Sequence, residues 1–181
     1  MNCMQQDIKE ILLTEEQLRT KIREIGQQVS KEYVGKDLML VGILKGSVPF
    51  MADLLKEITI PCTMDFMAVS SYGVSSKTSG IVRILKDLDF EIEGKHVLIV
   101  EDIIDSGTTL AYLIEYLKGR KPDSLEIACL LSKPEKRNIK INAKYVGFVV
   151  PDYFLVGYGL DYAEKYRNLP YIGILKEEVY Q

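Results

Sequence analysis

Continuous apolar runs alternate along this chain with segments whose apolar residues recur at helical spacing. Residues 38–44 and 97–100 are unbroken apolar stretches, which is typical of strands buried on both faces of a sheet. Between them, residues 48–58 have the pattern of a helix that tolerates Pro49 in its first turn. Because strands alternating with helices form parallel sheets with right-handed crossovers, the pattern predicts an α/β fold.

The remaining elements follow from the same two periodicities. Thr-Glu-Glu-Gln at residues 14–17 is a capping box that begins an amphipathic helix, and Gly35 ends it. Further strands are expected at 62–71, 81–85, 125–131 and 145–149, and a further helix at 108–117. From about residue 151 the chain is aromatic and glycine-rich without a preceding linker. We therefore expect one domain over residues 1–181, a central, mostly parallel sheet flanked by helices, with the C-terminal segment packed as a small hood.

Composition narrows the possible classes of protein. The 181 residues are 47% hydrophobic and carry a net charge of −3, which suits an ordinary globular protein without a general attraction to nucleic acid or to a membrane. Three scattered cysteines and the absence of a signal-like N-terminus favour a soluble, cytoplasmic protein. His96, the single histidine, precedes a strand at its amino end, so we expect it to be structural and exclude histidine-based nucleophilic catalysis.

Residues 97–109 carry the clearest candidate chemistry, because an apolar strand there runs into three carboxylates and a glycine turn. Glu101 and Asp102 come at the carboxyl end of the strand, where open α/β sheets bind ligands. Gly107 permits a tight turn, and the hydroxyls and N–H groups of residues 106–109 open a helix, which suits a phosphate. Neither a P-loop nor a dinucleotide-binding glycine pattern is present. We interpret the acids as acceptors for ribose hydroxyls and as stabilisers of a ribosyl cation, with the 5-phosphate in the turn.

A known family has a motif that residues 97–109 resemble, here Val-Leu-Ile-Val-Glu-Asp-Ile-Ile-Asp-Ser-Gly-Thr-Thr. It is the 5-phosphoribosyl-pyrophosphate motif of the type I phosphoribosyltransferases. Three further segments resemble the hypoxanthine-guanine branch of that family in the same order, namely Leu-Lys-Gly-Ser at 44–47, Ser-Ser-Tyr-Gly at 70–73 and Val-Gly-Tyr-Gly-Leu-Asp-Tyr at 156–162. The resemblance implies the type I phosphoribosyltransferase fold. It also implies transfer of the phosphoribosyl group to N9 of hypoxanthine or guanine, giving IMP or GMP and pyrophosphate, with Mg²⁺.

The resemblance further implies a role for each matched position. Asp105 would be the catalytic acid/base near the purine N7. Ribose and phosphoribosyl pyrophosphate would be bound by Glu101, Asp102, Asp105, Ser106, Gly107, Thr108 and Thr109. Thr108 stands where many relatives carry lysine, so this loop would depend more on amides and hydroxyls. Pyrophosphate would contact Lys45, Gly46 and Arg167, the first two in a non-proline cis segment, and Ser71 and Tyr72 would lead a lid over 71–80.

The implied base pocket lies farther along the chain. Lys133 would donate to the 6-oxo group of the purine, which a 6-amino purine could not accept in the same way. Phe154 would stack on the base and the backbone at Leu155 would read its edge. Asp161 would complete this pocket and also serve as a magnesium ligand, in addition to Glu101 and Asp102.

Each assignment has a simpler structural alternative. Asp105 or Ser106 could merely cap a helix, Lys133 could lie in a solvated charged loop, Phe154 could belong to the core, Lys45 and Gly46 could form an ordinary turn, and Asp161 with Arg167 could be a salt bridge on a helix. Residues 71–80 could be a passive hairpin loop, and the aromatic tail could be a subunit contact.

Two other functions remain open at this stage. The first is transfer to another base, such as xanthine, adenine or a pyrimidine, although Lys133 argues against adenine. The second is a non-catalytic regulator that senses phosphoribosyl pyrophosphate, for which we would expect a DNA-binding segment or a basic face that these residues lack. A homodimer or homotetramer is expected. The preference between hypoxanthine and guanine is not predicted.

Overall fold

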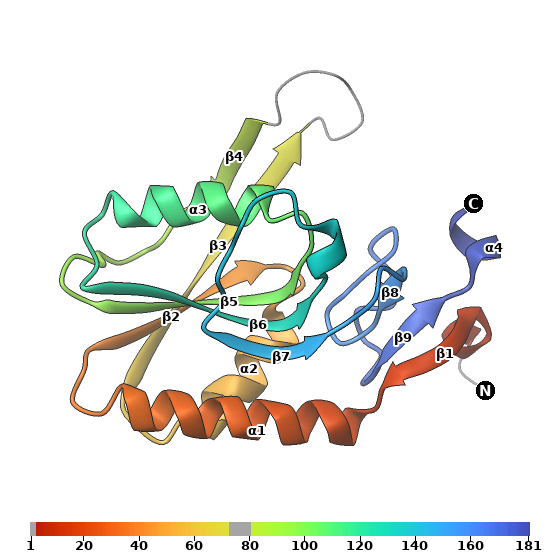
Figure 1. Cartoon of the computed structure of the whole chain (residues 1–181), viewed down its shortest axis with the longest axis horizontal. Helices are drawn as coiled ribbons and strands as arrows, with labels where there is room; N and C mark the ends of the chain where they lie inside the picture. Colours follow the sequence, from red (N-terminus) through yellow and green to blue (C-terminus); the bar gives the residue numbers. More distant parts are fainter. Residues whose placement is uncertain (1–2, 73–80) are drawn as a thin grey trace.

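A large sheet, a small sheet and the helices around them organise the computed structural model, which describes residues 3–72 and 81–181 (Figure 1). In chain order the elements are η1 (Cys3–Asp7), β1 (Ile8–Leu13), α1 (Glu15–Glu32), β2 (Leu38–Leu44), α2 (Val48–Glu57), β3 (Cys62–Tyr72), β4 (Ile81–Lys86), β5 (His96–Ile104), α3 (Thr108–Lys118), β6 (Ser124–Ser132), η2 (Pro134–Lys136), β7 (Tyr145–Val149), β8 (Leu155–Val156), β9 (Ile172–Leu175) and α4 (Glu177–Tyr180). Most of the predicted lid, residues 73–80, lies outside the described residues, as do the side chains of Ser71 and Tyr72.

The large sheet has the strand order β4-β3-β2-β5-β6-β7. Strands β3, β2, β5, β6 and β7 pair in parallel, and β4 pairs antiparallel with β3 at one edge. The predicted α/β fold with a mostly parallel sheet is therefore confirmed. From β2 the chain passes through α2 to β3, whereas from β5 it passes through α3 to β6 on the other side. The direction of winding changes between β2 and β5, and ligands bind at the carboxyl ends of strands beside such a switch point.

Both faces of the large sheet are covered, which explains the continuous apolar runs. Helices α1 and α2 cover one face and α3 covers the other (Figure 1). On β5, Leu98 and Val100 pack towards α1 and α2, while Val97 and Ile99 pack towards α3. All four side chains are fully buried. Burial of this kind contributes about 1.5–3 kcal/mol for each large apolar side chain, so β5 is a rigid support for whatever follows it.

The capping box predicted before α1 is present. Gln17 N donates to Thr14 Oγ1 at 3.3 Å, and Thr14 N donates to Gln17 Oε1 at 2.8 Å. The helix ends near Gly35, as expected, with the glycine in the left-handed region at a φ of 75°. Local sequence signals thus determine the helix that covers the lower face of the sheet in Figure 1.

The C-terminal hood is a small antiparallel sheet with the strand order β1-β9-β8. It lies at one end of the molecule, beside both termini (Figure 1). Strands β8 and β9 belong to the tail that was expected to form the hood. Strand β1 comes from the opposite end of the chain and was not predicted. Among the described helices, none combines the length and the apolar character needed to cross a membrane.

Candidate active site

The carboxyl ends of the parallel strands bring together site residues that are far apart in the sequence. Lys45 and Gly46 follow β2, Glu101 and Asp102 lie near the end of β5, and Lys133 follows β6. A pocket of about 480 Å³ opens at this edge and is lined by Asp102, Ile103, Asp105, Lys133, Lys136, Asp152, Tyr153, Phe154, Leu155, Leu160, Asp161 and Tyr180. His96 lies at the opposite, amino end of β5, where its Nδ1 is 2.8 Å from Ser124 Oγ, in keeping with the structural role expected for it.

Glu101 and Asp102 are adjacent, partly buried carboxyl groups near the end of β5, and their titrations are coupled through their charges. Burial, followed by the negative charge of Asp102, raises the pKa of Glu101 well above its ordinary value. Burial also raises the pKa of Asp102, although the hydrogen bond that Ile103 N donates to its Oδ1 at 2.8 Å acts in the opposite direction. Two carboxylates this close resist carrying two charges, and a cation or hydroxyl donors beside them would relieve the repulsion.

Gly46 lies directly against the Asp102 carboxylate. A Cβ at this position would stand only 1.6 Å from Asp102 Oδ2, so the close approach of the β2 turn to β5 requires glycine. The preceding peptide bond, Leu44–Lys45, is cis. A non-proline cis peptide is thus present at this turn, one residue before the Lys45–Gly46 peptide at which the resemblance implied it.

Gly107 is the N-cap residue of α3 and has a φ of 82°. The N-cap position is thus taken by a glycine and not by Asp105 or Ser106, although Ser106 Oγ accepts a long hydrogen bond from Thr108 N at 3.4 Å. A cavity of about 130 Å³ lies in this loop and is lined by Glu101, Ile103, Ile104, Asp105, Ser106, Gly107, Thr109 and Leu110. Thr108 is exposed and is not part of this lining. Because the first N–H groups of a helix have no partner within it, this cavity suits an anion.

Asp105 lies where the loop cavity and the larger pocket meet, since it lines both. Its Oδ1 atom is buried and receives no hydrogen bond from any of the described residues. Its Oδ2 atom is 4.0 Å from Lys136 Nζ. A buried carboxylate oxygen without a donor is costly unless a ligand or water provides one, so Asp105 Oδ1 is an open acceptor at the junction of the two cavities.

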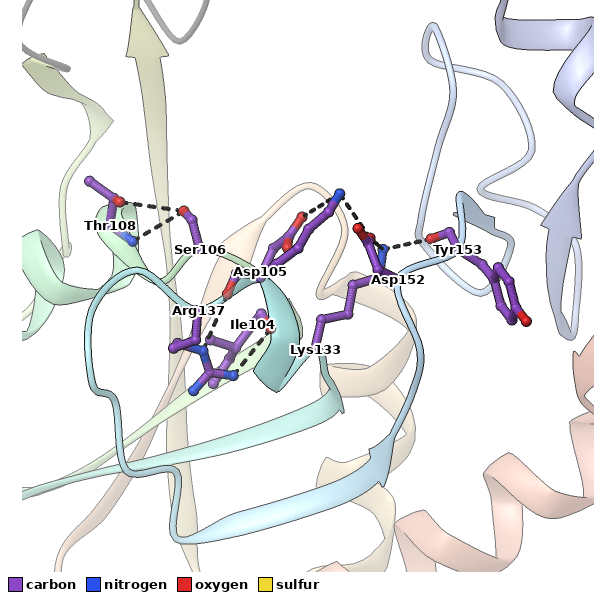
Figure 2. A network of polar contacts seen from close by, with 9 residues as sticks. Ile104, Asp105, Ser106, Thr108, Lys133, Arg137, Asp152 and Tyr153 are labelled. Atoms are coloured by element: carbon purple, nitrogen blue, oxygen red, sulfur yellow. Dashed lines mark hydrogen bonds and ion pairs between the residues drawn. The ribbon is translucent and has the colours of Figure 1, made fainter.

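Lys133 is buried beneath the larger pocket rather than in a solvated loop, which overturns the simpler alternative. Its Nζ donates to Tyr153 O at 2.6 Å and lies 3.4 Å from Asp152 Oδ1 (Figure 2). Lys136 Nζ lies 2.9 Å from the same Asp152 Oδ1. The hydrogen bond from Lys136 holds the pKa of Asp152 below its ordinary value. An ammonium group has three N–H donors, so one remains for an acceptor in the pocket.

Phe154 is on the wall of the same pocket and is 37% exposed, so it does not belong to the core. Tyr180 stacks on its ring at 4.6 Å between centroids, and Tyr162 meets it edge-on at 5.4 Å. This support was not predicted, because α4 and the segment before β8 meet only in the folded chain. The Leu155 side chain also contributes to the pocket wall but is otherwise buried in the core.

The predicted pyrophosphate cations share one acidic partner. Glu164 Oε2 is 3.0 Å from Lys45 Nζ, and Glu164 Oε1 is 3.2 Å from Arg167 Nη2. The hydrogen bond from Lys45, followed by that from Arg167, lowers the pKa of Glu164. Arg167 also contacts Asp161 Oδ1 at 2.9 Å. Asp161 and Arg167 thus form the salt bridge considered above, but in a loop between β8 and β9 rather than on a helix.

The three acids proposed as magnesium ligands do not form one cluster. Within residues 3–72 and 81–181, no three His, Cys, Asp or Glu side chains lie close enough together to hold a metal ion. Glu101 and Asp102 remain as a pair, and Asp161 is held instead by Arg167 and by the backbone N–H of Glu164, at 2.9 Å from its Oδ2. Asp161, which the resemblance assigns to a second magnesium ion, therefore lies apart from Glu101 and Asp102.

Several pocket residues were missed from the sequence. Ile103 is two residues after Glu101 on β5, so strand spacing could have placed both on the same side, where both line the loop cavity, and Ile103 also lines the larger pocket. Lys136 and Asp152 belong to charged segments that resemble solvated loops, so no local signal distinguishes them. Tyr180 lies on a helix of only four residues that has no clear pattern of its own.

Comparison with known proteins agrees with this geometry. The family model described as "Phosphoribosyl transferase domain" matches residues 9–163. The hypoxanthine-guanine phosphoribosyltransferase of Bacillus subtilis is 54% identical over 178 residues, which cover 98% of this chain and 99% of that protein. The crystal structure of a hypoxanthine phosphoribosyltransferase from Staphylococcus aureus superposes with a TM-score of 0.96 at 55% identity and covers 100% of this chain and 99% of that one.

A longer relative is equally similar over a part of its length. The bifunctional protein TilS/HprT of Listeria monocytogenes is 56% identical over 177 residues, so the chain spans 27% of that protein. The family match covers well over half of the present sequence, and the matched region contains the carboxylate pair, the loop that follows β5 and the lysine of the base pocket. The chain therefore belongs to the phosphoribosyl transferase family.

Proposed function

We propose that this protein transfers the 5-phosphoribosyl group of 5-phosphoribosyl pyrophosphate to N9 of hypoxanthine or guanine, which yields IMP or GMP and releases pyrophosphate. The names of relatives that match over nearly their whole length support this choice of substrates. So does the position of the pocket, which joins a phosphate-sized cavity at the start of α3 to an aromatic wall at Phe154.

The observation that carries the choice of base is the buried Lys133. Its ammonium group is held by Tyr153 O and has a donor left for the pocket, and lysine offers no acceptor. A 6-oxo purine accepts a hydrogen bond at this position, whereas a 6-amino purine presents donors. With Phe154 against the ring, Lys133 would hold the base through its 6-oxo group and orient it towards Asp105.

Asp105 would then manage the proton on the purine as the new bond forms. Asp105 lines both the sugar-phosphate cavity and the base pocket, and its Oδ1 has no hydrogen-bond partner among the described residues. Glu101 and Asp102 would accept hydrogen bonds from the ribose hydroxyls and stabilise the positive charge that develops on the sugar. Lys45, Gly46 and Arg167 would bind the departing pyrophosphate. Closure of the segment led by Ser71 and Tyr72 would exclude water.

The chemistry of the acidic pair fits Mg²⁺, which binds one or two carboxylates together with substrate phosphates. Glu101 and Asp102 offer oxygen ligands, and a cation beside them would relieve the repulsion that raises their pKa values. Asp161 would contribute separately from the hood side. When bound with the substrate, magnesium would neutralise charge on the pyrophosphate leaving group.

We also propose a cytoplasmic location and a homodimer or homotetramer. The odd number of cysteines in the sequence suits a reducing compartment. The exposure of Leu85 and Phe90, at 61% and 62%, gives the edge of the large sheet an apolar surface that a second subunit could cover. Light scattering on the purified protein would measure the number of subunits.

A pyrophosphate-release assay with a panel of bases tests the proposed reaction. With 5-phosphoribosyl pyrophosphate and Mg²⁺, we expect hypoxanthine and guanine to release pyrophosphate and to give IMP and GMP by chromatography, and adenine to give neither. Turnover of xanthine alone would favour the alternative substrate. Binding of 5-phosphoribosyl pyrophosphate without pyrophosphate release from any base would favour the sensing regulator and contradict the proposal.

A further inference from the structure

Arg137 holds the backbone of the proposed 5-phosphate loop from behind. Its Nε donates to Asp105 O at 3.2 Å and its Nη2 donates to Ile104 O at 3.3 Å (Figure 2). The same Nη2 donates to Ser132 Oγ at 2.9 Å, and Nη1 donates to Ile141 O at 3.2 Å. One half-buried guanidinium group thereby joins the end of β5 to the end of β6 and to the loop before β7.

The residues after Arg137 complete this support. Asn138 N and Ile139 N donate to Ser106 O at 3.0 Å and 3.3 Å. Three successive carbonyl groups of the loop, from Ile104 to Ser106, are thus all bound by the segment 137–139. In a trans peptide the N–H points opposite to the C=O of the same unit. The N–H groups of residues 105–107 therefore point away from Arg137.

The loop cavity and Arg137 occupy different sides of this backbone. Asp105, Ser106 and Gly107 line the cavity of about 130 Å³, and Arg137 is not among its lining residues. A Cβ at position 107 would stand 3.3 Å from Arg137 Cδ, which places the aliphatic part of the arginine against the turn itself. Arg137 therefore contacts the loop and not the space where a ligand would lie.

The positive charge of Arg137 would also favour a phosphate in the loop. Residues 101–109 contain three acids and no lysine or arginine, so the loop provides no cation of its own for a phosphate. The hydrogen-bond partners of the Arg137 guanidinium group are carbonyl and hydroxyl oxygens, and within the described part of the chain no carboxylate forms an ion pair with it. Its positive charge is thus available to a phosphate across the loop, through one layer of backbone.

We propose that Arg137 is a positioning residue for the 5-phosphate site, which acts by aligning the N–H groups of residues 105–107 towards the phosphate. This inference rests on the proposed function. It assigns a specific role to a side chain that the sequence presents only as part of a charged run, and it predicts a defect confined to ligands that carry the 5-phosphate.

The first test is Arg137→Lys, which retains the charge but cannot form the fork of hydrogen bonds. We expect KM for 5-phosphoribosyl pyrophosphate to rise on the order of tenfold, as for loss of hydrogen bonds to a charged group, while KM for hypoxanthine stays within about twofold. Calorimetric binding should show a comparable loss for IMP and none for inosine, which lacks the phosphate. Arg137→Ala should bind 5-phosphoribosyl pyrophosphate more weakly still. Added guanidinium at a non-denaturing concentration should partly restore that binding.

Two further variants separate positioning from folding. Arg120→Lys is the matched control, because Arg120 is also partly buried and hydrogen-bonded, to Asp87 and Tyr116, at the far end of α3. It should leave both KM values unchanged. Ser132→Ala removes one partner of Arg137 and should raise KM for 5-phosphoribosyl pyrophosphate by about threefold, which keeps the test open if the Arg137 variants fail to fold.

The possible outcomes discriminate between the two proposals. A folded Arg137→Lys protein with an unchanged KM for 5-phosphoribosyl pyrophosphate would overturn the inference, as would equal losses for IMP and inosine. If only Ser132→Ala folds, its unchanged KM would overturn the inference in the same way. If the wild-type protein binds neither IMP nor 5-phosphoribosyl pyrophosphate, the proposed function itself fails, and the role of Arg137 fails with it.

Discussion

The acidic half of the candidate site, which consists of Glu101, Asp102 and Asp105, and its basic half, the predicted pyrophosphate cations Lys45 and Arg167, are built in different ways. Glu101, Asp102 and Asp105 lie at the end of β5, which is flanked by β2 and β6 and covered on both faces. Lys45 and Glu164, in contrast, pair at the surface, with 67% and 65% of their side chains exposed. The acids are fixed by the core of the protein, whereas the cations depend on turns.

This difference suits two kinds of electrostatic task. Charge that develops on a sugar is stabilised best by groups that are already in place and shielded from water. A leaving pyrophosphate must be bound and then released, and exposed ion pairs are individually weak and readily exchanged. We therefore expect substitutions in the acidic half to impair the chemical step or stability strongly, and those in the basic half to change substrate binding modestly.

Asp105→Asn should have the largest effect. The amide cannot accept the purine proton, so kcat should fall by about 10²–10⁴-fold, the usual contribution of general acid–base catalysis. Steady-state kinetics with hypoxanthine would measure it. Asp123→Asn is the control, since Asp123 is exposed at the opposite end of the sheet and should retain full activity. Wild-type turnover by Asp105→Asn would show that the assigned proton role is wrong.

Lys133→Met should have the second-largest effect on activity. Loss of a hydrogen bond from a charged donor costs about 1.5–3 kcal/mol, which corresponds to a rise of about 10–100-fold in KM for hypoxanthine. KM for 5-phosphoribosyl pyrophosphate should change little, because Lys133 lines the base pocket and does not line the loop cavity. Lys140→Met, in the exposed part of the following loop, is the control. An unchanged KM for hypoxanthine would remove Lys133 from base recognition.

Glu101→Gln should stabilise the protein in the absence of magnesium and substrate. The pKa of Glu101 is raised on folding, so its ionisation disfavours the folded state at any pH above the unfolded value near 4.5. At pH 7–8 the variant should therefore be more stable than the wild-type protein and unfold at a higher Tm. The gain should disappear near pH 4, where both states are protonated.

Thermal unfolding as a function of pH measures this effect, with Glu93→Gln as the control at an exposed position. A wild-type protein that is as stable as Glu101→Gln at pH 8 would mean that the carboxylate pair carries no repulsion. The description of Glu101 and Asp102 as a partly buried pair whose negative charges repel each other would then be incorrect.

Lys45→Met should have the smallest effect. Because the Lys45–Glu164 pair is mostly exposed, its loss should change stability by less than about 1 kcal/mol. KM for 5-phosphoribosyl pyrophosphate should rise by about 2–5-fold in about 0.1 M salt, and the difference from wild type should shrink in about 1 M salt, where screening is stronger. A defect that persists at high salt would indicate that Lys45 acts through a contact shielded from water and not through an exposed ion pair.

The part of the fold that could be predicted from sequence is the part whose signals are local. The apolar run at β2, the capping box of α1 and the glycine at the start of α3 each determine their element within a few residues. The residues of the candidate site at the end of β5 could be predicted for the same reason. Gly107 was expected in the turn and is found there in the left-handed conformation.

Contacts between distant segments could not be predicted in this way. Strand β1 pairs with β9 across almost the whole chain, and its sequence, Ile-Lys-Glu-Ile-Leu-Leu, alternates poorly. The stacking of Tyr180 on Phe154 and the four hydrogen bonds of Arg137 likewise join segments that approach only after folding. Separation of Asp161 from the acidic pair has the same origin, because its position depends on the loop between β8 and β9.

Selection of a 6-oxo purine nucleotide by the buried Lys133 can be measured by calorimetric binding of IMP and AMP to the wild-type protein and to Lys133→Met. The two ligands share the ribose and the 5-phosphate and differ at the 6-position that Lys133 would contact. We predict that the wild-type protein binds IMP at least about tenfold more tightly than AMP and that Lys133→Met loses this preference. Equal binding of IMP and AMP by the wild-type protein, or a preference that survives in Lys133→Met, would contradict the account.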